Sequence, residues 1–124
     1  MEHLVFLKEI ELNNAVLILG LEGYADAGGA ASFTLNYLRK KLGAECIAMI
    51  SHVALQDYTV HRPITLIEGG LVKAVHPPLS KIYYAKSGEN WVVLVQGPEP
   101  NFGWFQYIKY ILDLYSKVKA SKIF

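Results

Sequence analysis

One short apolar run strongly constrains what this chain can fold into. Residues 15–19 read Ala-Val-Leu-Ile-Leu, and a glycine-rich segment follows over residues 20–29. A run without polar alternation is typical of a strand buried on both faces, as the strands of parallel sheets are. Ligands of open α/β sheets often bind where such a strand meets the next helix. The run therefore predicts an α/β fold and directs attention to the loop that follows it.

Periodicity predicts a helix over about residues 29–42. Four apolar residues recur at spacings of four, three and four, which places them on one helix face: Ala31, Leu35, Leu38 and Leu42. Gly43 suits the position just past the end of such a helix. Residues 45–50 then read as a second buried strand. The order strand, helix, strand predicts a right-handed crossover with parallel pairing of the two strands.

Further strands and tight turns are predicted on either side of an irregular segment over residues 51–63. Gly69-Gly70 separates two apolar runs, which is a strong signal for a β-hairpin. The strands expected besides those above are residues 4–7 at an edge, 64–67, 71–75, a weakly alternating stretch at 81–86, and 91–95. The sheet is therefore expected to be mixed, with an antiparallel hairpin as an insert.

A final helix is predicted after residues 97–101, because Pro100 suits a first turn and Glu99 or Asn101 can cap it. Its central apolar stripe is expected at Trp104, Ile108, Ile111, Tyr115 and Val118. Flanking apolar residues widen this face to about half the circumference. Residues 122–124 begin another strand. We expect a single α/β domain over residues 1–124, built as a three-layer α/β/α sandwich that is incomplete at its C-terminal end.

Composition excludes several classes of protein. The 124 residues suit one domain, and the net charge of +1 gives no broad basic patch, so nucleic acid is not an expected partner. No apolar run reaches the roughly 20 residues needed to span a bilayer, and no secretory signal is visible, so a cytoplasmic protein without membrane contact is expected. Cys46 is the single cysteine. It excludes an internal disulfide and a cysteine-based zinc site, and we expect it to be a buried thiol.

The loop after the first core strand admits two interpretations. Free backbone N–H groups near Gly23, Gly28 and Gly29 could bind an anion at the start of the helix. However, the Gly-Lys-Ser/Thr ending of a phosphate-binding loop is missing, and Asp26 brings a negative charge. In the simpler interpretation, Asp26 caps the helix and the glycines allow close packing.

Arg62, which precedes Pro63, is one of only two arginines. It could form a structural ion pair with Asp26 or Glu99 across the sheet edge. It could instead hold the carboxylate or phosphate of a ligand with its planar guanidinium. In the second case the first loop, Arg62 and Glu99 would form a site for a small ligand or nucleotide, in a binding protein or a hydrolase-like enzyme.

Neither a metal site nor a set of catalytic residues is predicted. The four histidines lack the spacing of a ligand pair such as His-Glu-x-x-His, so no metal and no cofactor is expected. Ser51, His52 and Asp57 contain the residue types of a hydrolytic triad. They lack the sequence that exposes a serine nucleophile, and we discount them.

Several aromatic residues are candidates for a protein interface. Phe33 and Tyr37 lie four residues apart, outside the apolar stripe of the first helix. They could contact a second chain, or they could belong to a three-layer core. On and before the last helix, the candidates for an interface are Phe102, Phe105 and Tyr110.

Three segments, in this order and spacing, resemble the proteasome assembly chaperone 2 family, especially its archaeal members. They are residues 21–29 (Leu-Glu-Gly-Tyr-Ala-Asp-Ala-Gly-Gly), 58–63 (Tyr-Thr-Val-His-Arg-Pro) and 97–100 (Gly-Pro-Glu-Pro). The motif residues are Gly23, Asp26, Gly28, Gly29, Arg62, Pro63, Gly97, Pro98 and Glu99. The similarity runs from about residue 15 to residue 124.

The resemblance implies a sandwich related to phosphorylase/hydrolase-like folds and a non-catalytic role in protein assembly. It also implies homo-oligomers and proteasome α-subunits as partners. Typical family members are about twice as long, so the chain is expected to correspond to an N-terminal portion. The hydrophobic–tyrosine–any tripeptide with which some archaeal relatives dock on the proteasome is replaced here by Lys122-Ile123-Phe124.

Overall fold

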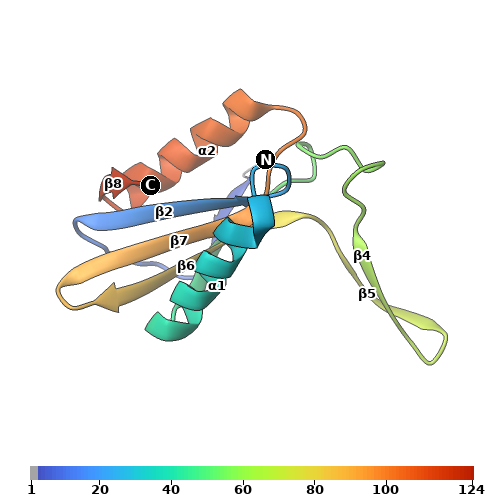
Figure 1. Ribbon diagram of the computed structural model, residues 1–124, viewed down its shortest axis with the longest axis horizontal. Helices are drawn as coiled ribbons and strands as arrows, with labels where there is room; N and C mark the ends of the chain where they lie inside the picture. The colour runs from blue at the N-terminus through green and yellow to red at the C-terminus, as the bar shows by residue number, and fades with distance from the viewer. Residues whose placement is uncertain (1–2) are drawn as a thin grey trace.

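The computed structural model describes residues 3–124. A six-stranded mixed sheet has one helix on each face, and a separate two-stranded hairpin projects from one end (Figure 1). The sheet has the order β1 (Leu4–Phe6), β3 (Glu45–Ser51), β6 (Leu79–Ser87), β7 (Asn90–Pro98), β2 (Ala15–Glu22), β8 (Ala120–Ile123). The hairpin consists of β4 (Ile64–Glu68) and β5 (Leu71–His76), and the helices are α1 (Ala30–Leu42) and α2 (Trp104–Lys117), with a 3-10 turn η1 (Ala27–Gly29) before α1. The predicted α/β sandwich is confirmed.

The topology corrects one expectation about strand pairing. β2 is flanked by parallel strands, β7 and β8, whereas β6 pairs antiparallel with both β7 and β3. β3 therefore does not pair with β2, although strand, helix and strand follow in sequence as predicted. The strands β6 and β7 fill the gap between them, because their tight turn at Gly88 lets them enter the sheet together.

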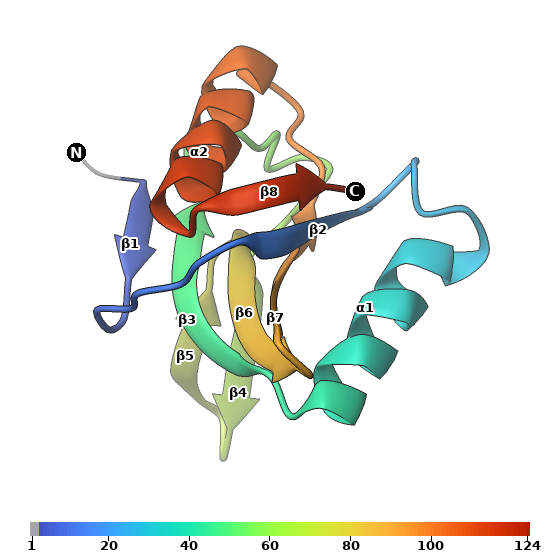
Figure 2. The same cartoon turned by 90° about the vertical axis from the view of Figure 1, so that its left-hand side faces the viewer.

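Alternation along the strands divides the apolar side chains between two cores. Leu17, Val93 and Val95 face α2, and the core on this side also includes Tyr107, Ile111, Leu114 and Val118 from that helix. The neighbouring residues on the same strands, such as Ile18 and Leu94, face α1 and pack with Leu35 and Leu38. Figure 2 shows the two helices on opposite sides of the sheet. Buried strands with both faces covered explain the continuous apolar run at residues 15–19.

Gly20 allows α1 to approach the sheet closely. A Cβ at this position would overlap Leu35 Cδ1. The helix covers residues 30–42 and ends at Gly43, whose φ of 62° is left-handed, as predicted. Cys46 is half-buried beside the α1-facing core, so it is less enclosed than we expected.

The last helix differs from its prediction in start and orientation. It begins at Trp104 after Gly103, so Pro100 precedes the helix, and Glu99 and Asn101 do not cap it. Its buried side chains are Tyr107, Ile111 and Leu114, whereas Trp104 and Ile108 of the predicted central stripe are exposed. A helix that is apolar over half its circumference does not specify which part faces the sheet, because several stripes have similar hydrophobicity.

The hairpin formed by β4 and β5 is confirmed, and it lies away from the rest of the fold (Figure 1). Gly69 and Gly70 have φ angles of 59° and 78°, as a two-residue hairpin turn requires. Its large apolar side chains are 50–71% exposed: Ile64, Leu66, Ile67, Leu71, Val72 and Val75. The described part of the chain therefore covers neither face of this hairpin.

No helix among residues 3–124 is long and apolar enough to cross a membrane.

Candidate functional site

The carboxyl ends of β2, β3 and β7 meet at one edge of the sheet. They share this edge because β2 and β7 are parallel, and β3 lies antiparallel to β6, which is itself antiparallel to β7. The loops that leave this edge contain the three sequence segments 21–29, 58–63 and 97–100. Residues that are far apart in sequence are thereby brought together at the end where open α/β sheets bind ligands.

Glu99 joins the segment after β7 to the first loop. Its backbone N–H donates to Glu22 O at 2.8 Å, and its carboxylate Oε1 accepts a hydrogen bond from Tyr24 N at 3.0 Å. Gly23 has a φ of 129°, and a Cβ there would lie 2.8 Å from Glu99 Oε1. The Glu99 carboxylate thus lies beside the first loop, at the position where one of the two interpretations placed an anionic ligand.

Asp26 holds the first turn of α1. Its Oδ1 accepts hydrogen bonds from Ala31 N at 2.8 Å and Ser32 N at 3.2 Å. The Ser32 hydroxyl, and to a smaller extent the backbone N–H groups of Ser32 and Ala31, lower the pKa of Asp26 below its ordinary value. Gly28 and Gly29 have φ angles of 64° and 74°, and their left-handed backbone lets the chain turn between Asp26 and the helix. Asp26 thus already accepts from two of the free N–H groups at the start of α1, those of Ala31 and Ser32.

Asn101 joins the segment after β7 to the irregular loop over residues 52–63. Its Oδ1 accepts a hydrogen bond from Asp57 N at 2.8 Å and lies 3.1 Å from His61 Nδ1. Its backbone N–H donates to Leu55 O at 2.8 Å. These bonds fix the loop that leads to Arg62 and the hairpin.

A buried chain of polar side chains lies on the α2 side of the same edge. Gln56 Nε2 donates to His52 Nδ1 at 2.9 Å and to Glu99 O at 3.1 Å, and His52 Nε2 lies 2.7 Å from Ser80 Oγ. Burial, followed by the charge of His61, lowers the pKa of His52 from 6.5 to about 4. Because His52 is neutral and accepts at Nδ1, its proton lies on Nε2 and is donated to Ser80. Ser80 is fully buried, so this histidine–serine pair is closed to a substrate.

The side chains of Ser51 and Asp57 do not join this network. Ser51 Oγ accepts from Val53 N, and Asp57 Oδ1 accepts from Thr59 N and Oγ1. The discounted triad is thus not formed. Sequence reasoning missed the actual partner of His52, because Ser80 lies 28 residues later in a weakly patterned strand.

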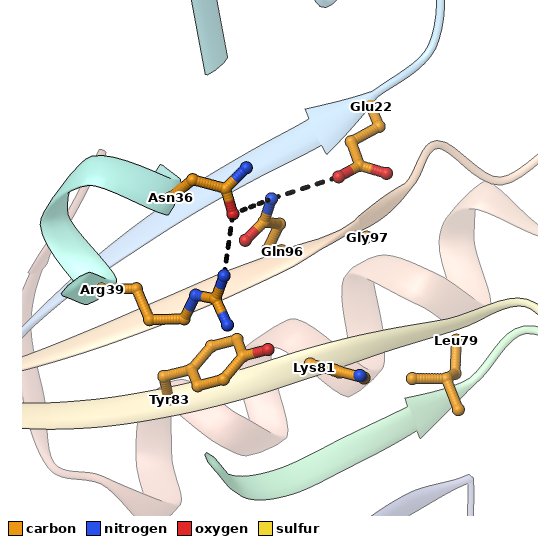
Figure 3. Close-up of a pocket in the computed structure, with 8 residues that line it drawn as sticks. All are labelled: Glu22, Asn36, Arg39, Leu79, Lys81, Tyr83, Gln96 and Gly97. Carbon is orange, nitrogen blue, oxygen red and sulfur yellow. Dashed lines mark hydrogen bonds between the residues drawn. The ribbon is translucent and has the colours of Figure 1, made fainter. Parts of the chain in front are cut away.

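A polar hollow of about 290 Å³ lies on the opposite, α1-facing side of this edge (Figure 3). Its polar floor is a chain of hydrogen bonds in which Gln96 Nε2 donates to Glu22 Oε1 and Asn36 Oδ1, and Arg39 Nη2 donates to Asn36 Oδ1. The Arg39 guanidinium lies over the Tyr83 ring, 5.1 Å from its centroid. Its Nε is buried and has no hydrogen-bond partner within residues 3–124. Alternation along β2, β6 and β7 places Glu22, Lys81 and Gln96 on this face.

A second hollow of about 610 Å³ adjoins the first and extends to the base of the hairpin. The two share Glu22, Leu79 and Lys81, and the second adds Arg62, His61 and His76. Among residues 3–124 the single ion pair within 4 Å joins Lys8 to Glu45. The expected ion pair of Arg62 with Asp26 or Glu99 is therefore not formed, because Asp26 is held by α1 and Glu99 by the first loop.

The remaining motif residues have packing positions. Gly97 is buried against β6, where a Cβ would lie 2.7 Å from Ser80 Cα. Pro98 lines the second hollow. Pro63 is exposed just before the hairpin. Arg39 and Lys81 had no functional signal in the sequence, since lysine and arginine near a helix end or on a strand are common on surfaces.

The aromatic residues of the predicted interface are mostly exposed. Phe33, Tyr37, Phe102 and Phe105 all present more than half of their surface to solvent. Tyr110 differs, because it is half-buried and stacks on His3 with the ring centroids 5.3 Å apart. Within the described part of the chain, no three metal-ligating side chains are grouped as a metal ion would require.

The sequence comparison and the structural comparison with known proteins point to the same family. The sequence model of the PAC2 family matches residues 20–124. A proteasome-assembly chaperone homologue from Mycobacterium tuberculosis is 28% identical, with a TM-score of 0.84 over 87% of this chain and 47% of that structure. A PAC2 family protein from Streptomyces avermitilis is 25% identical, with a TM-score of 0.76 over 89% of this chain and 48% of the other.

A protein of unknown function from Corynebacterium glutamicum is also 25% identical, with a TM-score of 0.82 over 98% of this chain and 48% of the other. The chain thus spans about half the length of the solved structures that it matches. No curated protein matches it.

Proposed function

Because the chain belongs to the PAC2 family, we propose that it is a non-catalytic protein-interaction module that associates with copies of itself and assists the assembly of a larger protein complex. Proteasome α-subunits are the proposed client. This part of the proposal draws on the similarity to the mycobacterial structure described as a proteasome-assembly chaperone homologue.

The observation that carries self-association is the uncovered hairpin. An isolated two-stranded hairpin is marginally stable in water, and this one has apolar side chains on both faces. Large exposed apolar patches usually mark sites of protein contact. The outer edges of β4 and β5 are also unpaired in the described chain, so their backbone groups are free to extend a partner's sheet.

Two further surfaces support contact with other chains. Phe102 and Phe105 lie before and at the start of α2, beside the exposed face of that helix, and Phe105 is 90% exposed. Phe33 and Tyr37 form a pair on the outer face of α1. We propose these as interface residues, with Tyr110 at the margin because it is already half-buried against His3.

Light scattering after size-exclusion chromatography tests self-association over a concentration series. The parent chain should give a mass above 13.9 kDa, and Ile67→Glu with Val72→Glu should shift it towards the monomer. Phe105→Glu and Phe33→Glu test the other two surfaces. Val53→Glu is the matched control, because Val53 is similarly exposed but outside all three patches. A parent chain that stays monomeric at high concentration would contradict self-association.

The assembly role needs a separate measurement. Purified proteasome α-subunits from the same organism are mixed with the chain, and native electrophoresis follows the formation of rings. The rate or yield of rings should rise with the parent chain and should rise less with the hairpin variant. Rings that form equally well without the chain, together with no retention of α-subunits on the immobilised chain, would refute this client.

A ligand site at the first glycine-rich loop is the alternative function, and the contacts there favour it less. The Glu99 carboxylate accepts from Tyr24 N, and Asp26 accepts from the first N–H groups of α1. Two carboxylates therefore occupy the places that the oxygen atoms of a phosphate would need. Titration with a nucleotide that shifts the backbone amides of residues 23–29 would revive this alternative.

A further inference from the structure

The hollow between α1 and the sheet contains more positive than negative charge. Arg39 and Lys81 line it, and Arg62 lines the adjoining hollow, whereas Glu22 is the single carboxylate among the lining residues of both. None of these three cations lies within 4 Å of a carboxylate of residues 3–124. Glu22 therefore offsets only part of their positive charge, and none of the three cations is engaged in an ion pair within the described chain.

Arg39 is held in place in a manner that suits binding. Its guanidinium stacks on Tyr83 and donates one hydrogen bond, from Nη2 to Asn36 Oδ1 at 3.2 Å. A guanidinium has five N–H donors, so most of its capacity is unused. Fixing its planar group in advance reduces the entropy that a bound oxyanion would otherwise cost.

Partial burial makes an unpaired guanidinium costly. Arg39 Nε is inaccessible to solvent and finds no acceptor among residues 3–124, and leaving a buried donor unsatisfied is unfavourable. An anion in the hollow would offset part of the cost of burying this charge, because charge-assisted hydrogen bonds to a guanidinium are strong. Gln96 and Asn36 border the same space and tie Arg39 to Glu22 through hydrogen bonds.

From this arrangement we propose that the hollow binds an oxyanion, either a carboxylate or a phosphate, through Arg39 and Lys81. Leu79 and Lys81 belong to both hollows, so the body of the ligand extends towards the hairpin, where Val60, Ile64 and Pro77 supply an apolar wall. The ligand class is thus a small molecule with an anionic head and an apolar part. Neither hollow is lined by residues 23–29, so this site differs from the anion position considered in the first loop, and it does not depend on the chaperone role.

Titration monitored by NMR tests the proposal with inorganic phosphate and with citrate, at constant ionic strength. Saturable shifts are expected for the side-chain amides of Asn36 and Gln96, which border the hollow. Whichever probe binds more tightly identifies the head group. Sodium chloride serves as the control for screening.

Charge variants provide the decisive comparison. Lys81→Gln should weaken binding about tenfold, as expected for the loss of one charge-assisted hydrogen bond, and Arg39→Gln at least as much. Glu22→Gln should strengthen binding, because it removes the single carboxylate. Lys41→Gln is the matched control, since Lys41 is an exposed cation of α1 that lines neither hollow, and it should leave the affinity unchanged.

Several results would overturn the proposal. They are the absence of saturable shifts with both probes, equal weakening by Lys41→Gln and Lys81→Gln, or no strengthening by Glu22→Gln. Lys81 is exposed, so Lys81→Gln keeps the test valid even if Arg39→Gln fails to fold.

Discussion

Acid should destabilise this fold through a single histidine. His52 is fully buried between Gln56 and Ser80, and its pKa is lowered from 6.5 to about 4 by burial and by the charge of His61. Gln56 donates to His52 Nδ1, and its amide orientation is set by Glu99 O, to which it also donates. A second proton on Nδ1 would face an N–H donor, so the folded state resists protonation.

The sign of the pH dependence follows from these two pKa values. Between about pH 4 and 6.5 the unfolded chain binds a proton at His52 that the folded chain does not. Stability is therefore fully retained above pH 6.5 and falls as the pH decreases towards 4. A shift of one pKa unit corresponds to about 1.4 kcal/mol, so a shift from 6.5 to about 4 limits the loss to about 3–4 kcal/mol. The carboxyls with lowered pKa, Asp26 and Asp57, titrate below 3.8 and lie outside this window.

Urea unfolding at a series of pH values measures this loss. The midpoint of the parent chain should fall between pH 6.5 and 4, and His52→Gln should be less stable at neutral pH but show a much smaller slope. His76→Gln, at an exposed histidine of the hairpin, is the matched control and should keep the parental slope. An NMR titration of His52 in the parent chain provides a check that needs no variant. A slope that persists in His52→Gln, or a His52 that titrates near 6.5, would refute the reasoning.

Three further predictions concern packing and helix capping. Gly97→Ala should lower the free energy of unfolding by about 2 kcal/mol or more in urea titrations, because its Cβ would lie 2.7 Å from the backbone Cα of Ser80; a fully stable variant would contradict this. Leu114→Ala should cost about 2–5 kcal/mol in the same assay, since it leaves a cavity under α2, and a smaller loss would mean that the helix closes the gap. Asp26→Ala should lower the melting temperature by removing the acceptor for Ala31 N. That difference should shrink as the pH falls below 3.8, where the Asp26 carboxyl, whose pKa is lowered, becomes protonated; a pH-independent difference would argue against the cap.

Much of the fold could be predicted because its signals are local. The run at residues 15–19 indicated a strand buried on both faces, Gly43 indicated the end of α1, and Gly69-Gly70 indicated the hairpin. Each of these depends on the backbone or burial of neighbouring residues. The insertion of β6 and β7 between β2 and β3 could not be predicted, because strand order depends on contacts between distant segments.

The candidate site was harder to predict, because its residues come from four separate elements. Asn36 and Arg39 lie on α1, Glu22 on β2, Gln96 on β7 and Lys81 on β6. Arg39 lies in the last turn of α1, where a positive charge interacts favourably with the helix dipole. This ordinary role accounted for the residue, so nothing in the sequence indicated that it belongs to a site. Its stacking on Tyr83 and its unpartnered Nε become apparent only when the strands are in register.

Side chains that alternate between the two faces of the sheet explain why its carboxyl edge holds two different polar groups, the buried His52 network on one face and the hollow beside α1 on the other. Ser80 and Lys81 are adjacent on β6, and their side chains lie on opposite faces of the sheet. Ser80 is sealed beneath α2 with His52, in a network whose hydrogen bonds fix the loop that follows β3. Lys81 faces the open hollow beside α1. The closed network holds the loop leading to Arg62 and the hairpin, so substitutions of His52 should disturb the shape of the second hollow, which this loop lines, without removing any of its charges.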